Sequence, residues 1–150
     1  MTEEQLNLLE ELKQTEEYSS AILGTYSFGG DFFEDEVLTR LQRLGIRNTT
    51  VLTDTEEYKT TDDLGHAGTK YYLDHVRCPQ RFHPKFVLLL GHRRGYCLVG
   101  SANLTAAGWQ HNAELMTEFK YTDAEDDAAT AAIFSQLVEF IDGITTTERV

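Results

Sequence analysis

The sequence of 150 residues contains 25 acidic and 13 basic side chains, which give a formal net charge of −12. Its hydrophobic content of 41%, with only 2 prolines, is that of a folded domain and excludes a disordered or linker-rich chain. No apolar run approaches the roughly 20 residues of a bilayer-spanning helix, so a membrane-spanning protein is excluded as well.

These limits favour one compact domain over residues 1–150. The acidic N-terminal stretch, where a secretory signal would be basic, predicts a cytoplasmic protein with no membrane partner. Cys78 and Cys97 could pair or could join histidines at zinc, but no Cys-x-x-Cys spacing supports either arrangement. We expect both thiols to be reduced, with no metal and no cofactor.

The first part of the chain predicts a β-α-β unit behind a short helix. Residues 2–13 read as that helix, and an apolar run predicts a strand over 18–28. Asp31 is expected to cap a second helix that ends at Gly45, and a second strand is expected over 46–53. This order implies parallel pairing of the two strands. The buried face of the second helix is expected to consist of four apolar residues: Phe33, Val37, Leu41 and Leu44.

The second part of the chain predicts a hairpin and a last helix. In order, we expect a polar loop (54–68), a short helix (69–76), two strands (82–90 and 96–101) joined by a turn at 91–95, a strand (115–121) and a helix from Asp123 to Gly143. The buried side of that helix is expected to carry Ile133, Leu137, Phe140 and Ile141. The fold class is therefore α/β, a mixed and mostly parallel β-sheet flanked by helices.

Four polar side chains suited to phosphodiester chemistry lie between residues 83 and 114. His83 and Lys85 share one side of a predicted strand, Asn103 follows the next strand, and Glu114 ends the segment after it. An imidazole can attack phosphorus, while a cation and an amide can hold phosphate oxygens. Each residue also has a plainer interpretation: a structural histidine, a solvated lysine, an asparagine that caps a turn, or one more surface acid.

Together these residues resemble the single motif copy of the phospholipase D superfamily, and most closely its metal-independent nuclease-like branch. The resemblance implies a phospholipase D-like α/β sandwich in which the histidine becomes a phosphohistidine. It further implies that the lysine and asparagine hold the phosphate and that the glutamate orients the imidazole. The residues that carry it are His83-x-Lys85, Gly100-Ser101-x-Asn103 and Glu114.

Two departures from the pattern disfavour phospholipase activity. Leu90 stands where the H-x-K-x4-D form of the motif carries Asp, and the hairpin before Gly100 is three residues longer than in that form. Neither departure disturbs the nuclease-like pattern.

The charge distribution predicts an anionic substrate. Residues 66–114 carry a net charge of +4, against −16 for the rest of the chain, and an acidic body around a basic segment can focus an anion onto it. The plainer alternative is a less acidic patch. Ser101 is expected to bond Glu114 or phosphate rather than to attack, because no Gly-x-Ser-x-Gly elbow surrounds it. Four further side chains are candidates for binding substrate: Tyr26, Arg81, Arg93 and Arg94.

The leading functional hypothesis is a metal-independent DNA nuclease, a hydrolase acting through a phosphohistidine. The alternatives are a catalytically silent DNA-binding or assembly domain of a larger machine, and a phospholipid-processing phosphodiesterase. Because the chain has one motif copy and the mechanism needs a second histidine, we expect a homodimer with a shared site or a second phospholipase D-like half in a longer chain.

Overall fold

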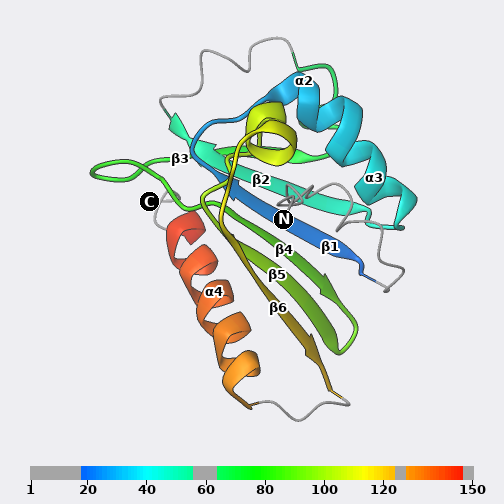
Figure 1. Ribbon diagram of the computed structural model, residues 1–150, viewed down its shortest axis with the longest axis vertical. Helices are drawn as coiled ribbons and strands as arrows, with labels where there is room; N and C mark the ends of the chain where they lie inside the picture. The colour runs from blue at the N-terminus through cyan, green and yellow to red at the C-terminus, as the bar shows by residue number, and fades with distance from the viewer. Residues whose placement is uncertain (1–17, 56–63, 124–127, 147–150) are drawn as a thin grey trace, which may run out of the picture.

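The computed structural model describes residues 18–55, 64–123 and 128–146, which form a six-stranded sheet with helices on both faces (Figure 1). The helix expected over 2–13 lies outside the described residues. The strands are β1 (Ser20–Thr25), β2 (Asn48–Asp54), β3 (Tyr72–Val76), β4 (Phe86–Gly91), β5 (Arg94–Gly100) and β6 (Met116–Thr122). The helical segments are α2 (Gly30–Phe32), η1 (Phe33–Val37), α3 (Leu38–Arg43), η3 (Ala107–His111) and α4 (Ala128–Thr146).

The sheet is mixed, as expected, in the order β3-β2-β1-β4-β5-β6. β1 pairs in parallel with β2, and β2 in parallel with β3, which confirms the β-α-β prediction. β4, β5 and β6 are all joined by antiparallel ladders, so the expectation of a mostly parallel sheet is wrong. For β4 and β5 the short connection dictates this, because a tight turn can join only antiparallel strands.

The prediction of a short helix over 69–76 is also wrong, because Tyr72–Val76 form edge strand β3 and residues 69–71 lie in the turn before it. Its aromatic and β-branched residues suit a strand, and the ladder with β2 supplies the hydrogen bonds that a short isolated helix would lack. Asp31 is not the helix cap either. It lies in the first turn, and Gly29 occupies the cap position without a side-chain hydrogen bond.

The last helix differs from the prediction at its end and on its buried side. α4 continues beyond Gly143 to Thr146. Phe140 is 43% exposed, whereas Phe134 and Ile141 are buried against the sheet. α4 packs against the β6 side of one face of the sheet (Figure 1), and Phe140 is not part of the apolar cluster beneath it. None of the helices among the described residues is long and apolar enough to cross a membrane.

The core is divided between the two faces of the sheet. One cluster lies under η1 and α3, where Phe33, Val37 and Leu41 are fully buried as predicted. The other lies under α4 and includes Cys97, whose pKa is raised by burial to about 12. Cys78 is half-buried, and neither cysteine forms a disulfide.

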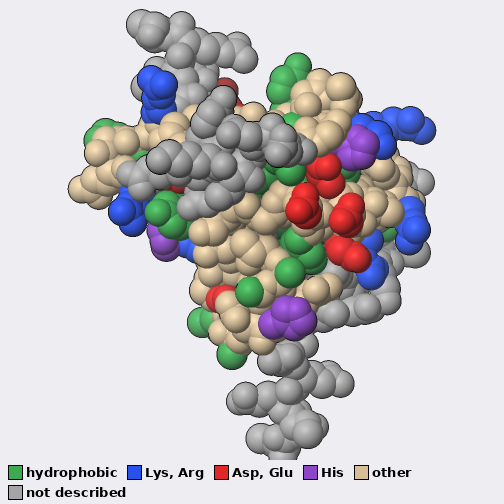
Figure 2. Space-filling view, turned by 90° about the horizontal axis from the view of Figure 1, so that it is seen from above, with side chains coloured by type: hydrophobic (Ala, Val, Ile, Leu, Met, Phe, Trp, Pro, Cys, Tyr) green, Lys and Arg blue, Asp and Glu red, His purple; other side chains and the backbone are tan. Residues whose placement is uncertain are grey.

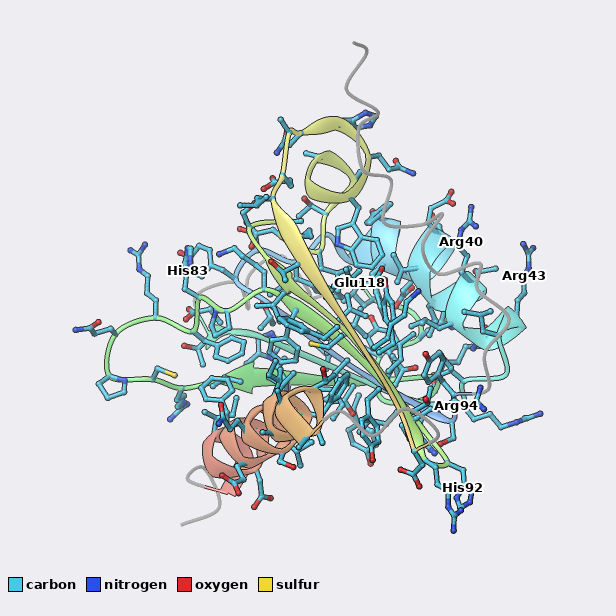
Figure 3. All side chains as sticks on the ribbon, turned by 60° about the horizontal axis from the view of Figure 1, so that its bottom comes forward. Arg40, Arg43, His83, His92, Arg94 and Glu118 are labelled. Carbon is cyan, nitrogen blue, oxygen red and sulfur yellow. The ribbon has the colours of Figure 1, made fainter. Side chains whose placement is uncertain are left out.

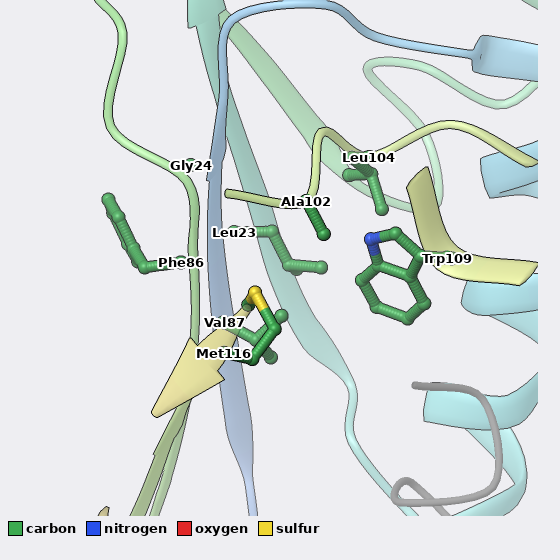
Figure 4. Close-up of a pocket in the computed structure, with 8 residues that line it drawn as sticks. All are labelled: Leu23, Gly24, Phe86, Val87, Ala102, Leu104, Trp109 and Met116. Carbon is green, nitrogen blue, oxygen red and sulfur yellow. The ribbon is translucent and has the colours of Figure 1, made fainter. Parts of the chain in front are cut away.

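The core beneath the end of β1 is closely packed. Figure 4 shows apolar side chains that converge on a void of about 10 Å³ there, enough for one water at most. No substrate could enter this space, so any chemistry must occur on the surface above it. The lining residues are Leu23, Gly24, Phe86, Val87, Ala102, Leu104, Trp109 and Met116.

Candidate active site

The residues predicted to be catalytic gather at one end of the sheet, where parallel strands β1 and β2 end and β4 begins. This is the end at which open α/β sheets place ligands. Figure 3 shows His83 at this end and the β4–β5 hairpin, with His92 and Arg94, at the other. Residues 81–85 are irregular rather than part of the expected strand, since β4 begins only at Phe86.

His83 and Lys85 are in direct contact. The Lys85 ammonium donates to the His83 carbonyl oxygen at 2.8 Å and lies 2.7 Å from Nδ1 and 3.2 Å from Nε2 of the same ring. Lys85 is only 6% exposed, whereas His83 is open to solvent. The two side chains therefore meet as expected, but through a tight local loop instead of strand alternation.

Two opposing effects act on the Lys85 ammonium. Burial is the larger and lowers its pKa, because desolvation disfavours the charged form, while the Glu114 carboxylate acts in the opposite direction. A buried cation beside an exposed imidazole suits a phosphate oxygen, which would supply a negative charge.

Tyr26 lies beside His83 and Arg81 lies beside Tyr26, while their role in binding substrate stays a prediction. The rings of Tyr26 and His83 have centroids 5.0 Å apart at an angle of 32°. The Arg81 guanidinium carbon lies 5.7 Å from the Tyr26 ring centroid. This stack limits the orientations of the imidazole and places a cation next to it.

The side chain of Asn103 is held through its amide oxygen. Its Oδ1 accepts the backbone N–H of Ser27 at 3.1 Å and faces the Thr25 hydroxyl at 3.4 Å. Thr25, fully buried, also accepts the N–H of Leu104 at 2.9 Å. Because the amide oxygen is occupied, the amide NH₂ is the group that Asn103 can offer to a phosphate.

Ser101 and Glu114 form a second pair. The Ser101 hydroxyl donates to Oε2 of Glu114 and accepts the N–H of Leu115 at 3.0 Å. Asn112 donates to Oε1 of Glu114 at 3.4 Å. Within the described residues no hydrogen bond joins Glu114 to His83, so the orienting role of Glu114 stays a prediction.

Asp54 is a site residue that sequence reasoning missed. It ends β2, is 2% exposed, and its Oδ2 accepts the backbone N–H of Phe82 at 2.6 Å. This bond fixes the chain one residue before His83. The signal was present in the sequence, because an acid directly after a β-branched run marks the carboxyl end of a parallel strand.

Arg93 and Arg94 are not part of this group. Arg93 lies in the turn and Arg94 begins β5 at the opposite end of β4, about 20 Å from Lys85 for a strand of 6 residues. Arg93 pairs there with Asp123 at 3.5 Å. Among the described residues no three histidine, cysteine or acidic side chains gather as metal ligands, and metal independence stays a prediction.

The basic segment that the charge map predicted is thus divided between the two ends of the sheet, with Lys85 at one end and Arg93 and Arg94 at the other. Four acidic side chains gather in the first turns of α2 and η1: Asp31, Glu34, Asp35 and Glu36. Figure 2 shows acidic side chains gathered on one face of the molecule, with lysines and arginines on either side.

Three comparisons place the chain among known proteins. A family model described as "Cardiolipin synthase, PLD-like domain" matches residues 8–138. The fold is similar to that of NucT from Helicobacter pylori, with a TM-score of 0.53 and 13% identity over 90% of this chain and 85% of that one. It is also similar to Nuc from Salmonella typhimurium, a phospholipase D family member, with a TM-score of 0.54 and 12% identity over 88% and 82% of the two chains. No curated protein matches significantly.

Proposed function

Because the chain belongs to the phospholipase D-like family, we propose that it is a phosphodiesterase that hydrolyses DNA without a metal ion. One observation carries this proposal above the others: the contact between buried Lys85 and exposed His83. A cation and a nucleophile in contact can engage the same phosphate, the first at a non-bridging oxygen and the second at phosphorus.

The reaction would proceed in two displacements. A ring nitrogen of His83 attacks phosphorus, the bond from phosphorus to one ester oxygen breaks, and a second histidine gives that oxygen its proton. Water then attacks the phosphohistidine, the second histidine takes the proton of the water, and the phosphorus–nitrogen bond breaks. Both histidines return to their starting states.

The remaining side chains would stabilise the charge that develops on phosphate. Lys85 and the Asn103 amide donate to the non-bridging oxygens. In the absence of substrate the Lys85 ammonium lies against the ring nitrogens of His83, and a phosphate oxygen would replace the ring as its partner. Substrate binding would thereby release the lone pair that attacks.

The second histidine is proposed to come from a second copy of this chain. Within the described residues no hydrogen bond or ring contact brings another histidine to His83, and His92 lies at the far end of the sheet. The exposed position of His83 leaves room for a two-fold related subunit to face it. A second phospholipase D-like half in a longer chain would serve the same purpose.

The proposed function is tested on supercoiled plasmid DNA in excess EDTA. We expect nicking, because the site combines a nucleophile with phosphate donors. Cleavage that begins only after Mg²⁺ or Zn²⁺ is restored would refute the metal-free mechanism. Binding without cleavage under either condition would favour a silent DNA-binding or assembly domain.

The shared site is tested by mixing subunits. When His83→Ala protein is co-assembled with wild-type protein, a heterodimer retains one of the two histidines and should be inactive. Activity then falls with the square of the wild-type fraction. A linear fall, or full activity from a proven monomer, would show that each subunit has its own complete site.

A phospholipid is the second candidate substrate, because the matching family description names cardiolipin synthase. Leu115, beside Glu114, is 79% exposed and could contact acyl chains. Incubation with phosphatidylglycerol vesicles, followed by analysis of the released headgroups, would separate this activity from DNA cleavage.

A further inference from the structure

A polar groove of about 390 Å³ lies at the end of the sheet opposite His83. It runs between the start of β2 and the turn that precedes β3. Two cations, Arg47 and Lys70, and one aromatic ring, Tyr72, line it together with threonine hydroxyls. None of these side chains contributes to the proposed active site.

The cations of the groove are exposed and carry uncompensated charge. Neither Arg47 nor Lys70 forms an ion pair with any acid among the described residues. Arg40 and Arg43 extend the positive charge along α3, and Figure 3 shows both on the side away from His83. Unpaired cations on a chain with a net charge of −12 favour an anionic ligand at this place.

The aromatic ring is equally unusual, because Tyr72 is 74% exposed on an edge strand. Its neighbour Tyr71 is buried, with its ring 4.8 Å from that of Phe33. The ring of Tyr72 is therefore open to a planar ligand beside the two cations. A simple inorganic anion would bind the cations alone, so the exposed ring indicates a ligand that carries a planar group as well as negative charge.

The turn that forms one wall of the groove is held in place from below. Glu34 accepts the Tyr71 hydroxyl at 3.0 Å and the N–H of His66 at 3.1 Å. The N–H of Lys70 bonds the His66 carbonyl at 2.9 Å, and Gly68 adopts a left-handed φ of +82° that suits a tight turn. The groove therefore exists before any ligand binds, which reduces the entropy lost on binding.

We propose that this groove binds a single strand of nucleic acid, with phosphates against Arg47 and Lys70 and one base stacked on Tyr72. Basic side chains that track a backbone and aromatic rings that stack bases are the two elements of single-strand recognition. A duplex would not present an unstacked base to the ring. β2 spans 7 residues, so the groove lies about 20 Å from the proposed active site. A long strand could occupy both places.

The test is the anisotropy of a fluorescein-labelled oligothymidine, measured with His83→Ala protein so that no cleavage intervenes. Tyr72→Ser should weaken binding about five- to hundred-fold and Tyr72→Phe should not, because stacking requires the ring and not the hydroxyl. Arg47→Gln and Lys70→Gln should each lower the slope of log affinity against log salt by about 0.7, the value for one phosphate contact on a single strand.

The matched control is Lys120→Gln, which removes the same charge from β6, the opposite edge of the sheet. It should leave binding unchanged. Wild-type affinity in Tyr72→Ser, equal loss in Lys120→Gln, or preference for a duplex of the same sequence would each overturn the proposal. Groove variants with His83 intact should cleave a small chromogenic phosphodiester normally. The binding assay needs no cleavage, so failure of the proposed enzyme activity would be seen separately.

Discussion

Both ends of the sheet carry cationic and other polar side chains, but these are hydrogen-bonded to the protein at one end and exposed to solvent at the other. At the end with His83, polar groups bond one another: Asp54 bonds the chain before the histidine, and Thr25 holds the loop of Asn103. At the end with Arg47, the backbone of the turn is held, but Arg47 and Lys70 extend into solvent and form no ion pair with an acid within the described part of the chain. Bond breaking needs fixed atoms, whereas retention of a polymer needs charge and an open surface. The difference predicts that substitutions at the first end alter turnover and those at the second alter affinity.

The largest expected effect contrasts two histidines at opposite ends. His83→Ala should lower DNA cleavage by about 10⁴-fold or more, because it removes the nucleophile. His92→Ala, on the hairpin, should remain within about two-fold of wild type because its side chain is exposed and remote from the site. Initial rates on plasmid DNA in EDTA measure both. Equal losses of cleavage activity in the two variants would contradict the assignment of catalysis to the end of the sheet with His83.

A smaller effect is expected from the buried acid behind the site. Asp54→Ala leaves the N–H of Phe82 without its acceptor, which should cost about 1–3 kcal/mol of unfolding free energy. Misplacement of the neighbouring histidine should lower kcat about ten- to hundred-fold with little change in KM. Asp54→Asn keeps an acceptor oxygen and should recover most of both. Urea unfolding and steady-state kinetics provide the measurements. A loss of stability with kcat unchanged would make Asp54 purely structural.

The smallest effect should appear in the pH profile. The protonated form of Lys85 binds phosphate, and burial lowers its pKa, so activity should fall with rising pH sooner than an ordinary lysine would cause. Glu114 raises that pKa, so Glu114→Gln should move the alkaline limb to still lower pH and slow turnover about ten-fold. Oligonucleotide binding in the far groove should not follow this shift. An alkaline limb that stays in place would remove Glu114 from this role.

Much of the fold could be predicted because local patterns and tertiary contacts agree. The stripe of Phe33, Val37 and Leu41 identified the buried face of the first described helix. β3 was missed because its five residues by themselves are compatible with a helix or a strand, and only the hydrogen-bonded ladder with β2 selects the strand. The prediction of a mostly parallel sheet was wrong for a related reason: the direction in which two strands distant in sequence pair is not encoded in any local pattern.

The site was predictable in its residues but not in its contacts. The spacing of His83, Lys85, Asn103 and Glu114 in the sequence predicted one catalytic site. The structure places their segments at one end of the sheet. The hydrogen bonds that hold them come from residues distant in sequence. Asp54 lies 28 positions from Phe82, and Thr25 lies 79 from Leu104. No local pattern encodes such pairs: the sequence can mark Asp54 as the end of a parallel strand, but not as the acceptor for the N–H of Phe82.

Cys97 can serve as a probe of how often the buried core opens. Its thiol is fully buried in β5 and its raised pKa of about 12 leaves almost no reactive thiolate at neutral pH. The chain has 2 cysteines, so Cys78→Ser would leave a single thiol, which packs under α4 and which a reagent can reach only when that cluster opens. The labelling rate of that variant then reports how often the packing between α4 and the sheet opens. Oligonucleotide that slows labelling would reveal mechanical communication between the bound polymer and the sheet.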